Sequence, residues 1–378
     1  MKSKKHNKEN NYILISPFMT QANVKPFDNL VNIIDVLANS IKVIVLYGEN
    51  VLLSNDNQDY IQKRHKSGKS PIKRIVFYFI DELFIAYYIA INKQYSNCIF
   101  FIGEVHVIPF IVAKIFRKKT ILVLGGSIEK LLAFYKDQFS TIIKVLKKIS
   151  LILSNKIIVY SKHLVNEWDL GNYTNKISIA HRHYINTNQF KINVKYKNRD
   201  NIIGYIGRLS EEKGIINFIK SIPLINKKYQ LNYIIGGSGQ LNEYINDYLD
   251  EENLHDNVQL VGWIPHQELP SYLNQLKLLI LPSFSEGLNN VMLEAMACGV
   301  PVLATPVGAV PDVIKDYETG FILTNNSPEC IAECIIDVIN FPDVMLEQIS
   351  KNAQEFIKKE FTFEKTLEKW RRVLGSVL

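Results

Sequence analysis

Short apolar runs alternate with helix-like segments along most of the 378 residues. Runs such as Val43–Leu46 and Leu278–Leu281 are apolar at every position, whereas a strand with one exposed face would be polar at every second position. Continuous apolar runs are typical of parallel strands that connecting helices cover on both faces. The alternation therefore predicts an α/β fold that is built on parallel sheets.

The expected strands fall into two sets, which predicts two doubly wound domains. The first set comprises Tyr12–Ile15, Val43–Leu46, Cys98–Ile102, Thr120–Leu124 and Lys156–Tyr160; the second comprises Ile202–Ile206, Leu231–Ile235, Val258–Val261, Leu278–Leu281, Val302–Ala304 and Gly320–Leu323. The polar stretch Lys191–Asp200 between the sets has the composition of an interdomain linker. We expect domains over residues 1–187 and 188–360, with ligands at the carboxyl ends of the strands.

Charge is distributed very unevenly along the chain. Residues 1–200 carry 30 Lys and Arg against 14 Asp and Glu, a net charge of +16, whereas residues 201–378 carry 14 and 23, a net charge of −9. Halves of opposite charge indicate domains with different partners.

The first ten residues are polar and basic and lack the apolar core of a signal peptide, so we expect a cytoplasmic protein. The four cysteines show neither C-x-x-C spacing nor a neighbouring histidine, which favours reduced thiols over a metal site.

The segment FSEGLNNVMLEAMACGVPVLATPVGAVP places two carboxylates around the start of a helix. Glu286 lies in the loop after an expected strand, and Glu294 lies on the helix, with seven residues between them. The free N–H groups of a helix N-terminus bind phosphate, and one carboxylate can accept hydrogen bonds from two sugar hydroxyls. The alternative is that these acids only complement the helix dipole.

Two further loops follow expected strands of the second half. Arg208 and Lys213 lie in IIGYIGRLSEEKGII, at the carboxyl end of a strand, where two cations between glycines can clamp a diphosphate. The alternative is an ordinary exposed charge run. The loop Gly236–Gly239 allows close backbone approach to a ligand, but it lacks the G-x-G-x-x-G frame of a dinucleotide site.

Together these segments resemble the donor domain of glycosyltransferase family 4, the retaining enzymes of the GT-B fold. GRLSEEKG is similar to the family's phosphate-binding loop, GGSGQL to the glycine loop that follows it, and VQLVGWIPHQELPSYL to its base-binding strand and helix. Glu286 and Glu294 match the family's E-x7-E motif. The resemblance is dense over residues 200–325.

The resemblance implies two Rossmann-like domains that face a central cleft, with the donor on the second. Arg208 and Lys213 would bind the donor diphosphate and stabilise the leaving group, and Glu286 would orient the transferred sugar. Glu294 would hold the ribose hydroxyls. The other implied donor-binding residues are Gly207, Gly237, Trp263, Ile264, Gly287, Leu288, Asn289, Asn290 and Val291. No D-x-D motif is present, so the cations and the helix end replace a metal ion, and we expect neither metal nor cofactor.

The first half resembles the family less. EVHVIPFIVAKIF, with Glu104 and His106, is similar to a strand-to-helix loop of the family. The family often has a histidine after the next strand, where this chain has Gly125 and Gly126. His106, Gly125 and Gly126 are therefore the candidate sugar or acceptor contacts, although a lone histidine is more often structural. By analogy with the fold, we expect the C-terminal helix, residues 361–378, to pack back on the first domain.

Two segments bear on the relation to a membrane. Ile75–Ile91 is very apolar, but it is shorter than the about 20 residues of a span and carries Asp81 and Glu82 at its middle, which favours a buried or surface-lying helix.

The second segment is Thr141–Leu153, which predicts a basic amphipathic helix with Lys144, Lys147 and Lys148 on one face. Residues 63–73 and 117–119 add further cations. This pattern favours a peripheral protein on the anionic inner face of the cell membrane; the alternative is an ordinary solvated domain.

We therefore expect a retaining glycosyltransferase that moves a hexose from a nucleotide-diphosphate sugar to a glycan or lipid-linked acceptor. An anionic membrane surface is a further expected partner, and nucleic acid is not. Two alternatives remain: a nucleotide-sugar isomerase of the same fold, and a non-catalytic homologue that binds sugar or lipid.

Overall fold

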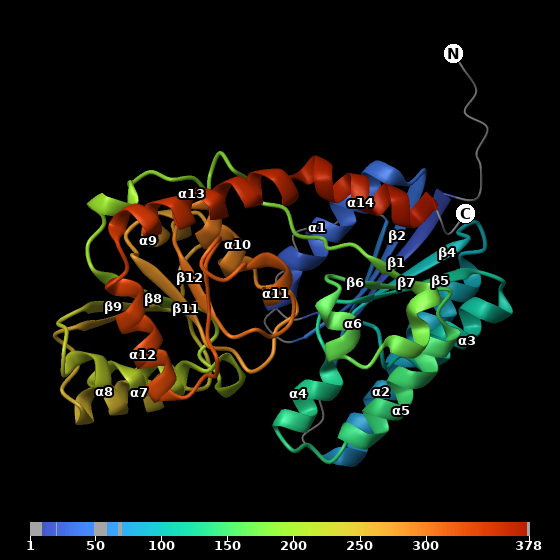
Figure 1. The fold of residues 1–378 in the computed structure, drawn as a ribbon. Coiled ribbons are helices and arrows are strands. Elements are labelled where there is room, and N and C mark those ends of the chain that lie inside the picture. Colours follow the sequence, from blue (N-terminus) through green and yellow to red (C-terminus); the bar gives the residue numbers. More distant parts are fainter. Residues whose placement is uncertain (1–9, 20, 49–58, 67–69, 376–378) are drawn as a thin grey trace. The chain divides into compact units, whose positions relative to one another are not determined.

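The computed structural model describes residues 10–19, 21–48, 59–66 and 70–375, which form two compact units (Figure 1). The first unit contains the residues up to 183 together with those from 366 onward, and the second contains residues 184–365. Each unit is built on one parallel sheet with helices on its faces, which is a Rossmann-like arrangement. The predicted α/β class with two parallel sheets is confirmed.

The first unit contains a seven-stranded parallel sheet with the order β3-β2-β1-β4-β5-β6-β7. Its strands are β1 (Asn11–Met19), β2 (Ser40–Tyr47), β3 (Tyr60–Arg64), β4 (Asn97–Phe101), β5 (Lys119–Leu124), β6 (Lys156–Val159) and β7 (Ile177–Ile179). In register, Tyr12 of β1 lies opposite Ile41 of β2 and Asn97 of β4. The order reverses between β1 and β4, so the sheet is doubly wound and its ligand edge is expected there.

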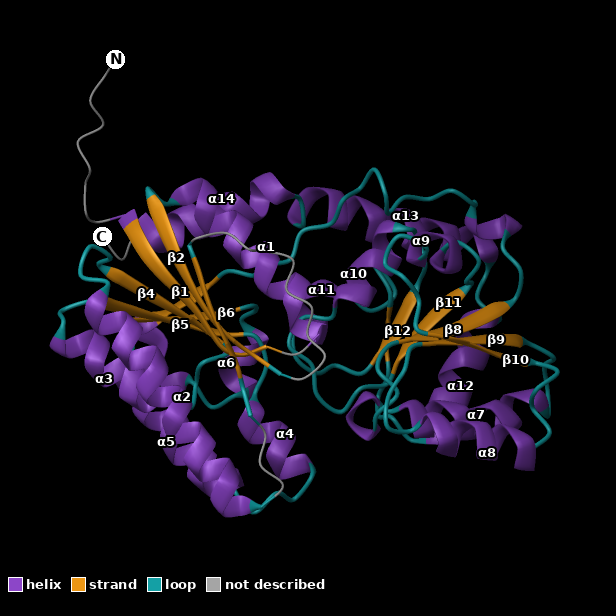
Figure 2. Ribbon diagram, turned by 180° about the vertical axis from the view of Figure 1, so that it is seen from behind, coloured by secondary structure: helices purple, strands orange, loops and turns teal. Residues whose placement is uncertain are grey.

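Helices cover both faces of the first sheet. The helices α2 (Pro71–Ile91), α3 (Val107–Ile115) and α5 (Ser140–Leu153) lie side by side on one face, while α1 (Gln21–Leu37) and the later part of α14 (Phe363–Gly375) lie on the other (Figure 2). The short elements are α4 (Ile128–Phe134), α6 (His163–Glu167) and the 3-10 turn η2 (Gly171–Lys176).

The end of the chain is an integral part of the first unit. Trp370 of α14 is fully buried, and its indole Nε1 donates a hydrogen bond of 2.9 Å to the carbonyl of His181. Thr366 is also fully buried and donates from Oγ1 to the carbonyl of His183, again at 2.9 Å. These contacts join α14 to the segment that leaves the last strand, β7.

The second unit contains a six-stranded parallel sheet with the order β10-β9-β8-β11-β12-β13. Its strands are β8 (Ile202–Ile206), β9 (Asn232–Gly236), β10 (Val258–Gly262), β11 (Leu278–Leu281), β12 (Val302–Ala304) and β13 (Phe321–Ile322). The helices are α7 (Ile215–Asn226), α8 (Asn242–Glu251), α9 (Leu269–Leu273), α10 (Asn290–Ala297), α11 (Val310–Val313), α12 (Pro328–Ile339) and α13 (Asp343–Glu360). The main apolar core joins β8 and β9 to residues of α7 and α12.

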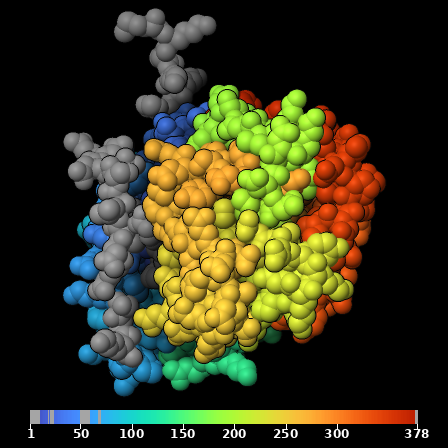
Figure 3. All heavy atoms as spheres, turned by 90° about the vertical axis from the view of Figure 1, so that its left-hand side faces the viewer, coloured from blue at the N-terminus to red at the C-terminus, as the bar shows by residue number. Residues whose placement is uncertain are grey.

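The polar stretch Lys191–Asp200 is not a linker between the units, because the boundary lies at residues 183 and 184. Figure 3 shows this segment, in light green, at the surface of the second unit. The guanidinium of Arg199 is buried and donates to the carbonyls of Val194, Leu276 and Cys298 at 2.7–3.1 Å. Seven of the ten residues are exposed, so the polar composition belongs to a surface segment that the buried Arg199 anchors to the unit.

Candidate functional site

The segment with the two cations and the segment with the carboxylates follow the two central strands of the second sheet. Strands β8 and β11 are neighbours there, and the strand order reverses between them. The loop after β8 carries Arg208 and Lys213, and the loop after β11 carries Glu286. The backbone N–H of Phe284 donates to the carbonyl of Glu212 at 2.9 Å, which holds the loops together. Ligands of doubly wound sheets bind at this switch point.

Gly214 allows the two loops to approach. Its φ is +70°, and an added Cβ would lie 2.0 Å from the carbonyl oxygen of Pro282. A larger residue would therefore be strained in both conformation and space. Because Gly214 is the residue before α7, the loop turns sharply and leaves Lys213 facing the β11 loop.

Lys213 forms an ion pair with Glu286. The ammonium Nζ lies 2.8 Å from Oε1, and both side chains are largely buried. The same oxygen accepts hydrogen bonds from the Ser283 hydroxyl and from Nδ2 of Asn289, each at 2.9 Å. Three donors thus converge on Oε1, while Oε2 receives no hydrogen bond from the described residues. The carboxylate is fixed in orientation and keeps one oxygen for a further donor.

Arg208 is the more exposed of the two cations, with 57% of its side chain accessible. Its Nη1 lies 3.5 Å from Oε1 of Glu212, a buried carboxylate that also accepts from the Ser210 hydroxyl at 2.7 Å. The hydroxyl of Tyr205 donates to the backbone carbonyl of Arg208 at 2.9 Å and orients the turn. Most N–H donors of the guanidinium therefore point to solvent. Arg208 and Lys213 belong to the same loop.

Glu294 lies on α10 and is held by a histidine that the sequence did not single out. Nε2 of His266 lies 2.7 Å from Oε1 of Glu294. The imidazole packs edge to face against Phe190 with ring centroids 5.1 Å apart, and the His266 carbonyl accepts from Nε2 of Gln189 at 3.2 Å. His266 is thus fixed on two sides, and Glu294 is oriented from the neighbouring β10–α9 loop.

The N-terminus of α10 points its backbone N–H groups toward the same edge of the sheet. Asn289 is the N-cap, and its side chain accepts from the N–H of Met292 at 3.1 Å. Gly287, Leu288 and Asn290 surround the cap, and Val291 follows in the first turn. Asn289 thus satisfies only the N–H of the third helical residue. The earlier N–H groups and the positive end of the helix dipole can still interact with an anion.

The glycines of this edge are needed by the protein's own packing. Gly237 has a φ of +133°, and an added Cβ would lie 1.8 Å from the carbonyl oxygen of Gly207. The N–H of Gly237 donates to the carbonyl of Gly262 at 2.6 Å, so three strand ends touch backbone to backbone. Ile264 packs its side chain over Gly236, whereas the ring of Trp263 is 70% exposed. Trp263 is therefore accessible beside this edge.

In the first unit, His106 lies in a buried polar cluster. Its Nδ1 lies 2.6 Å from Oε1 of Glu82, and Oε2 of Glu82 accepts from the N–H of Ile108 at 2.8 Å. Both side chains are at most 9% exposed. This arrangement favours a structural role, because the histidine's partner is an internal carboxylate.

The two glycines after β5 differ in their surroundings. An added Cβ on Gly125 would lie 2.9 Å from the hydroxyl of Tyr160, whereas one on Gly126 would meet no atom within 4 Å. Glu104, before α3, is fully buried and accepts from the N–H of Ile128 at 2.9 Å. Burial raises the pKa of Glu104 to about 7, although the charge of Lys147 opposes this shift.

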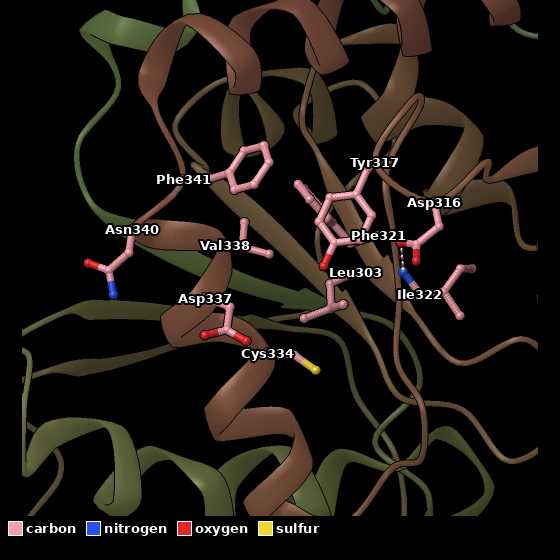
Figure 4. Close-up of a pocket in the computed structure, with 10 residues that line it drawn as sticks. All are labelled: Leu303, Asp316, Tyr317, Phe321, Ile322, Cys334, Asp337, Val338, Asn340 and Phe341. Atoms are coloured by element: carbon pink, nitrogen blue, oxygen red, sulfur yellow. Dashed lines mark hydrogen bonds between the residues drawn. The ribbon is translucent and has the colours of Figure 1, made fainter.

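Two cavities of the second unit lie away from these residues. One, of about 310 Å³, is lined by Tyr317, Phe321, Cys334 and Phe341 between β13 and α12 (Figure 4). The other, of about 540 Å³, lies beside the amino ends of β8, β9 and β10. Neither cavity includes a residue of the loops after β8 and β11 or of the N-terminus of α10.

In the described part of the chain, no three His, Cys, Asp or Glu side chains are placed to hold a metal ion. Metal independence stays a prediction. Among the helices of residues 10–19, 21–48, 59–66 and 70–375, none is both long and apolar enough to cross a bilayer.

Comparison with known proteins shows the fold of the chain and the family that most of the second unit matches. The Anabaena protein HepE, solved in complex with UDP-glucose, superimposes with a TM-score of 0.74 at 16% identity, over 97% of this chain and 99% of that one. The fold is therefore GT-B, with two Rossmann-like halves. Residues 186–356 match the family glycosyl transferases group 1.

Two sequence relatives are glycosyltransferases by name. The chain is 30% identical over 221 residues to an uncharacterized glycosyltransferase of Methanocaldococcus jannaschii, which covers 58% of this chain and 59% of the relative. It is 30% identical over 252 residues to the capsular polysaccharide biosynthesis glycosyltransferase CapM of Staphylococcus aureus, with 63% and 66% covered. The matches thus span less than two thirds of these relatives' own lengths.

Proposed function

We propose that the protein is a retaining glycosyltransferase that moves a hexosyl group from a nucleotide-diphosphate sugar to a glycan or lipid-linked acceptor. The observation that carries the proposal is the group of Arg208, Lys213 and Glu286 at the switch point of the second sheet, beside the N-terminus of α10. The match of residues 186–356 to the glycosyl transferases group 1 family supports it.

The donor would lie along the carboxyl edge of the second sheet. Its diphosphate would accept hydrogen bonds from Arg208, Lys213 and the N–H groups at the start of α10, where a helix dipole favours negative charge. The carboxylate of Glu294, already oriented by His266, can accept from two ribose hydroxyls. The structure of HepE with UDP-glucose, although only a likeness of fold, supports a nucleotide-sugar donor.

Catalysis would rest on stabilisation of the leaving group. When the bond between the anomeric carbon and the diphosphate breaks, the phosphate oxygen takes the electron pair and gains negative charge. Arg208 and Lys213 would stabilise that charge without a metal ion. The acceptor hydroxyl would bond to the anomeric carbon from the face that the diphosphate leaves, and its proton would pass to the oxygen of the leaving diphosphate. Glu286, with Oε1 fixed by three donors, would orient the sugar through Oε2.

The acceptor is proposed from charge and from the relatives. The name of CapM describes a glycosyltransferase of capsular polysaccharide biosynthesis, which supports a polymeric or lipid-linked acceptor. The first 200 residues carry the net charge of +16, which favours a location at the anionic inner face of the cell membrane.

Two measurements test the proposal. A thermal-shift screen of nucleoside diphosphates should raise the melting temperature for at least one base, because a ligand that binds only the folded state stabilises it. With the matching nucleotide sugar, sugar should leave the nucleotide only when an acceptor is present, and NMR should show the donor's anomeric configuration in the product. Acceptor-independent conversion would identify an isomerase instead, and binding without turnover would identify a non-catalytic homologue.

A further inference from the structure

One face of α2 exposes an apolar stripe along the whole helix. Six large side chains are between 46% and 75% exposed: Ile72, Ile75, Val76, Phe79, Leu83 and Tyr87. Their spacing of three and four residues places them on one side of the helix, which is about 30 Å long at 1.5 Å per residue. A stripe of this length on a folded unit marks a surface that has a partner.

The stripe continues onto the neighbouring helices. α3 packs beside α2, and α5 packs beside α3, on the outer side of the first unit (Figure 2). Ile115 at the end of α3, and Val145 and Ile152 on α5, are between 55% and 69% exposed. We call this surface of α2, α3 and α5 the three-helix face.

The acids of the three-helix face point away from it. Asp81 and Glu82 are the two acidic residues of α2, and both are buried, while α3 and α5 contain none. Asp81 binds Nζ of Lys63 at 2.8 Å and Nδ1 of His65 at 2.5 Å, and these hydrogen bonds outweigh burial, so the pKa of Asp81 lies below its usual range. Both carboxylates are thus used inside the unit and contribute no negative charge to the surface.

The exposed charges of the three helices are cations. Lys73 and Arg74, in the first turn of α2, and Lys144 and Lys148, on α5, are exposed, and we call these four cations the rim of the three-helix face. Two acids from outside these helices approach the rim, with Glu129 at 3.9 Å from Lys144 and Asp137 at 3.8 Å from Arg74. Such exposed pairs at these distances are weak and leave the rim positive.

The cationic surface differs from the sequence expectation. Lys147 is 4% exposed and pairs with Glu129 at 3.1 Å, and Lys118 is buried and donates to backbone carbonyls. Neither can reach a partner outside the unit. The face therefore has fewer exposed cations than the lysine pattern of residues 141–153 suggests, and most of its exposed apolar side chains are on α2.

An apolar stripe with a net positive rim fits an anionic lipid bilayer. A second copy that used the same face would bring like charges together, which disfavours a symmetric dimer. A helix with one apolar and one anchored face lies in the plane of the lipid surface, with its apolar side chains at the boundary of headgroups and acyl chains. Basic residues at the rim are attracted to anionic headgroups.

We propose that the three-helix face docks the first unit onto an anionic bilayer, with α2 parallel to the membrane plane and its apolar stripe in the lipid. The inference rests on the proposed function for the lipid-linked acceptor, but the contact with lipid itself requires no catalysis. It assigns the membrane contact to α2 rather than to the lysines of α5 alone.

Co-sedimentation with vesicles tests the docking. Wild-type protein should bind vesicles of phosphatidylglycerol and phosphatidylcholine in equal parts, and should bind phosphatidylcholine alone much less. The double variant Phe79→Asp and Leu83→Asp should lower the partition coefficient by at least about tenfold, since two apolar anchors become anionic. The matched control is Val344→Asp with Met345→Asp, because both residues are exposed apolar side chains on α13 of the second unit.

A second variant separates charge from apolar contact. Lys73→Glu with Arg74→Glu should weaken binding at low salt and reduce its salt dependence, because the screened part of the attraction is removed. Circular dichroism should show that all variants stay folded, as their side chains are exposed.

Three results would overturn the inference. The first is wild-type protein that stays in the supernatant with anionic vesicles at low salt. The second is Phe79→Asp, Leu83→Asp protein that binds as wild type does. The third is a dimer in sedimentation equilibrium that this variant dissociates, without vesicle binding. A melting-temperature shift with nucleoside diphosphate, measured without vesicles, tests the proposed function independently, so failure of one leaves the other standing.

Discussion

His266 and Glu294 are joined by a hydrogen bond of 2.7 Å between Nε2 and Oε1, across 28 residues of sequence. The carboxylate that would bind the donor's ribose therefore has one oxygen already engaged and one left for hydroxyls. The imidazole is itself fixed by Phe190 and by the backbone contact from Gln189. We regard His266 as a positioning residue of the donor site.

His266→Ala should raise the donor KM about tenfold and change kcat little, because a lost hydrogen bond to a charged group weakens binding by about 1.5 kcal/mol or more. His266→Gln can still donate to the carboxylate and should recover most of the affinity. Steady-state kinetics with varied donor concentration separate the two parameters. Equal KM values in wild type and both variants would show that Glu294 needs no such support.

Lys213→Ala and Arg208→Ala should each lower turnover by about 10²-fold or more, since each removes a charge that stabilises the leaving diphosphate. Nucleoside diphosphate binding should weaken by about 1.5–3 kcal/mol. Lys220→Ala is the matched control, because Lys220 is an exposed lysine of α7 beyond the loop. Calorimetric titration and initial rates provide the two readouts. Kinetics like those of the wild type in either loop variant would exclude the assignment.

Activity should survive treatment with EDTA, because two cations and a helix N-terminus supply the positive charge that a metal ion provides in other transferases. The measurement is the initial rate before and after removal of divalent ions on a chelating resin. Complete loss of activity that Mg²⁺ or Mn²⁺ restores would reject this mechanism.

Glu104→Gln should stabilise the first unit at neutral and alkaline pH. Burial raises the pKa of Glu104 to about 7 from a usual value of 4.5, so ionisation of the carboxyl disfavours the folded state. The wild type loses stability as pH rises from about 4.5 through about 7, and the variant does not. The gain should be near zero at pH 4 and approach about 3 kcal/mol above pH 8.

Urea unfolding of the two proteins at these pH values measures the difference. Glutamine keeps the oxygen that accepts from Ile128, so this hydrogen bond is preserved in the variant. A stability difference that does not change with pH would mean that the carboxyl ionises freely in the folded protein.

The strands that the sequence predicts are those with continuous apolar runs. All eleven expected strands are present, and the two that were missed are β3 and β7. β3 reads YIQKR and lies at the edge of the sheet, where its side chains are partly exposed, and β7 has only three residues. Neither strand has a continuous apolar run in the sequence, because an edge strand or a very short strand buries too few side chains to require one.

The candidate site could be predicted only where it is local in sequence. Glu286, Asn289 and the α10 N-terminus belong to one segment, and Arg208 and Lys213 to another, so motif spacing was sufficient. His266 could not be found in this way, because its role depends on a partner from a different loop. For the same reason, the sequence does not predict the burial of Lys147 or the ion pair of Asp81. The partner of each side chain lies 18 residues away. The sugar, the base and the acceptor depend on pocket shape, which these motifs do not encode.

The return of α14 to the first unit has a consequence for synthesis on the ribosome. Residues 184–365 form an uninterrupted unit and can complete their core as soon as they emerge. The first unit, although translated earlier, must wait for Thr366 and Trp370, whose fully buried side chains belong to its interior. Until residues 366–375 have left the exit tunnel, the nascent chain therefore carries a folded second unit together with a first unit whose core is still incomplete.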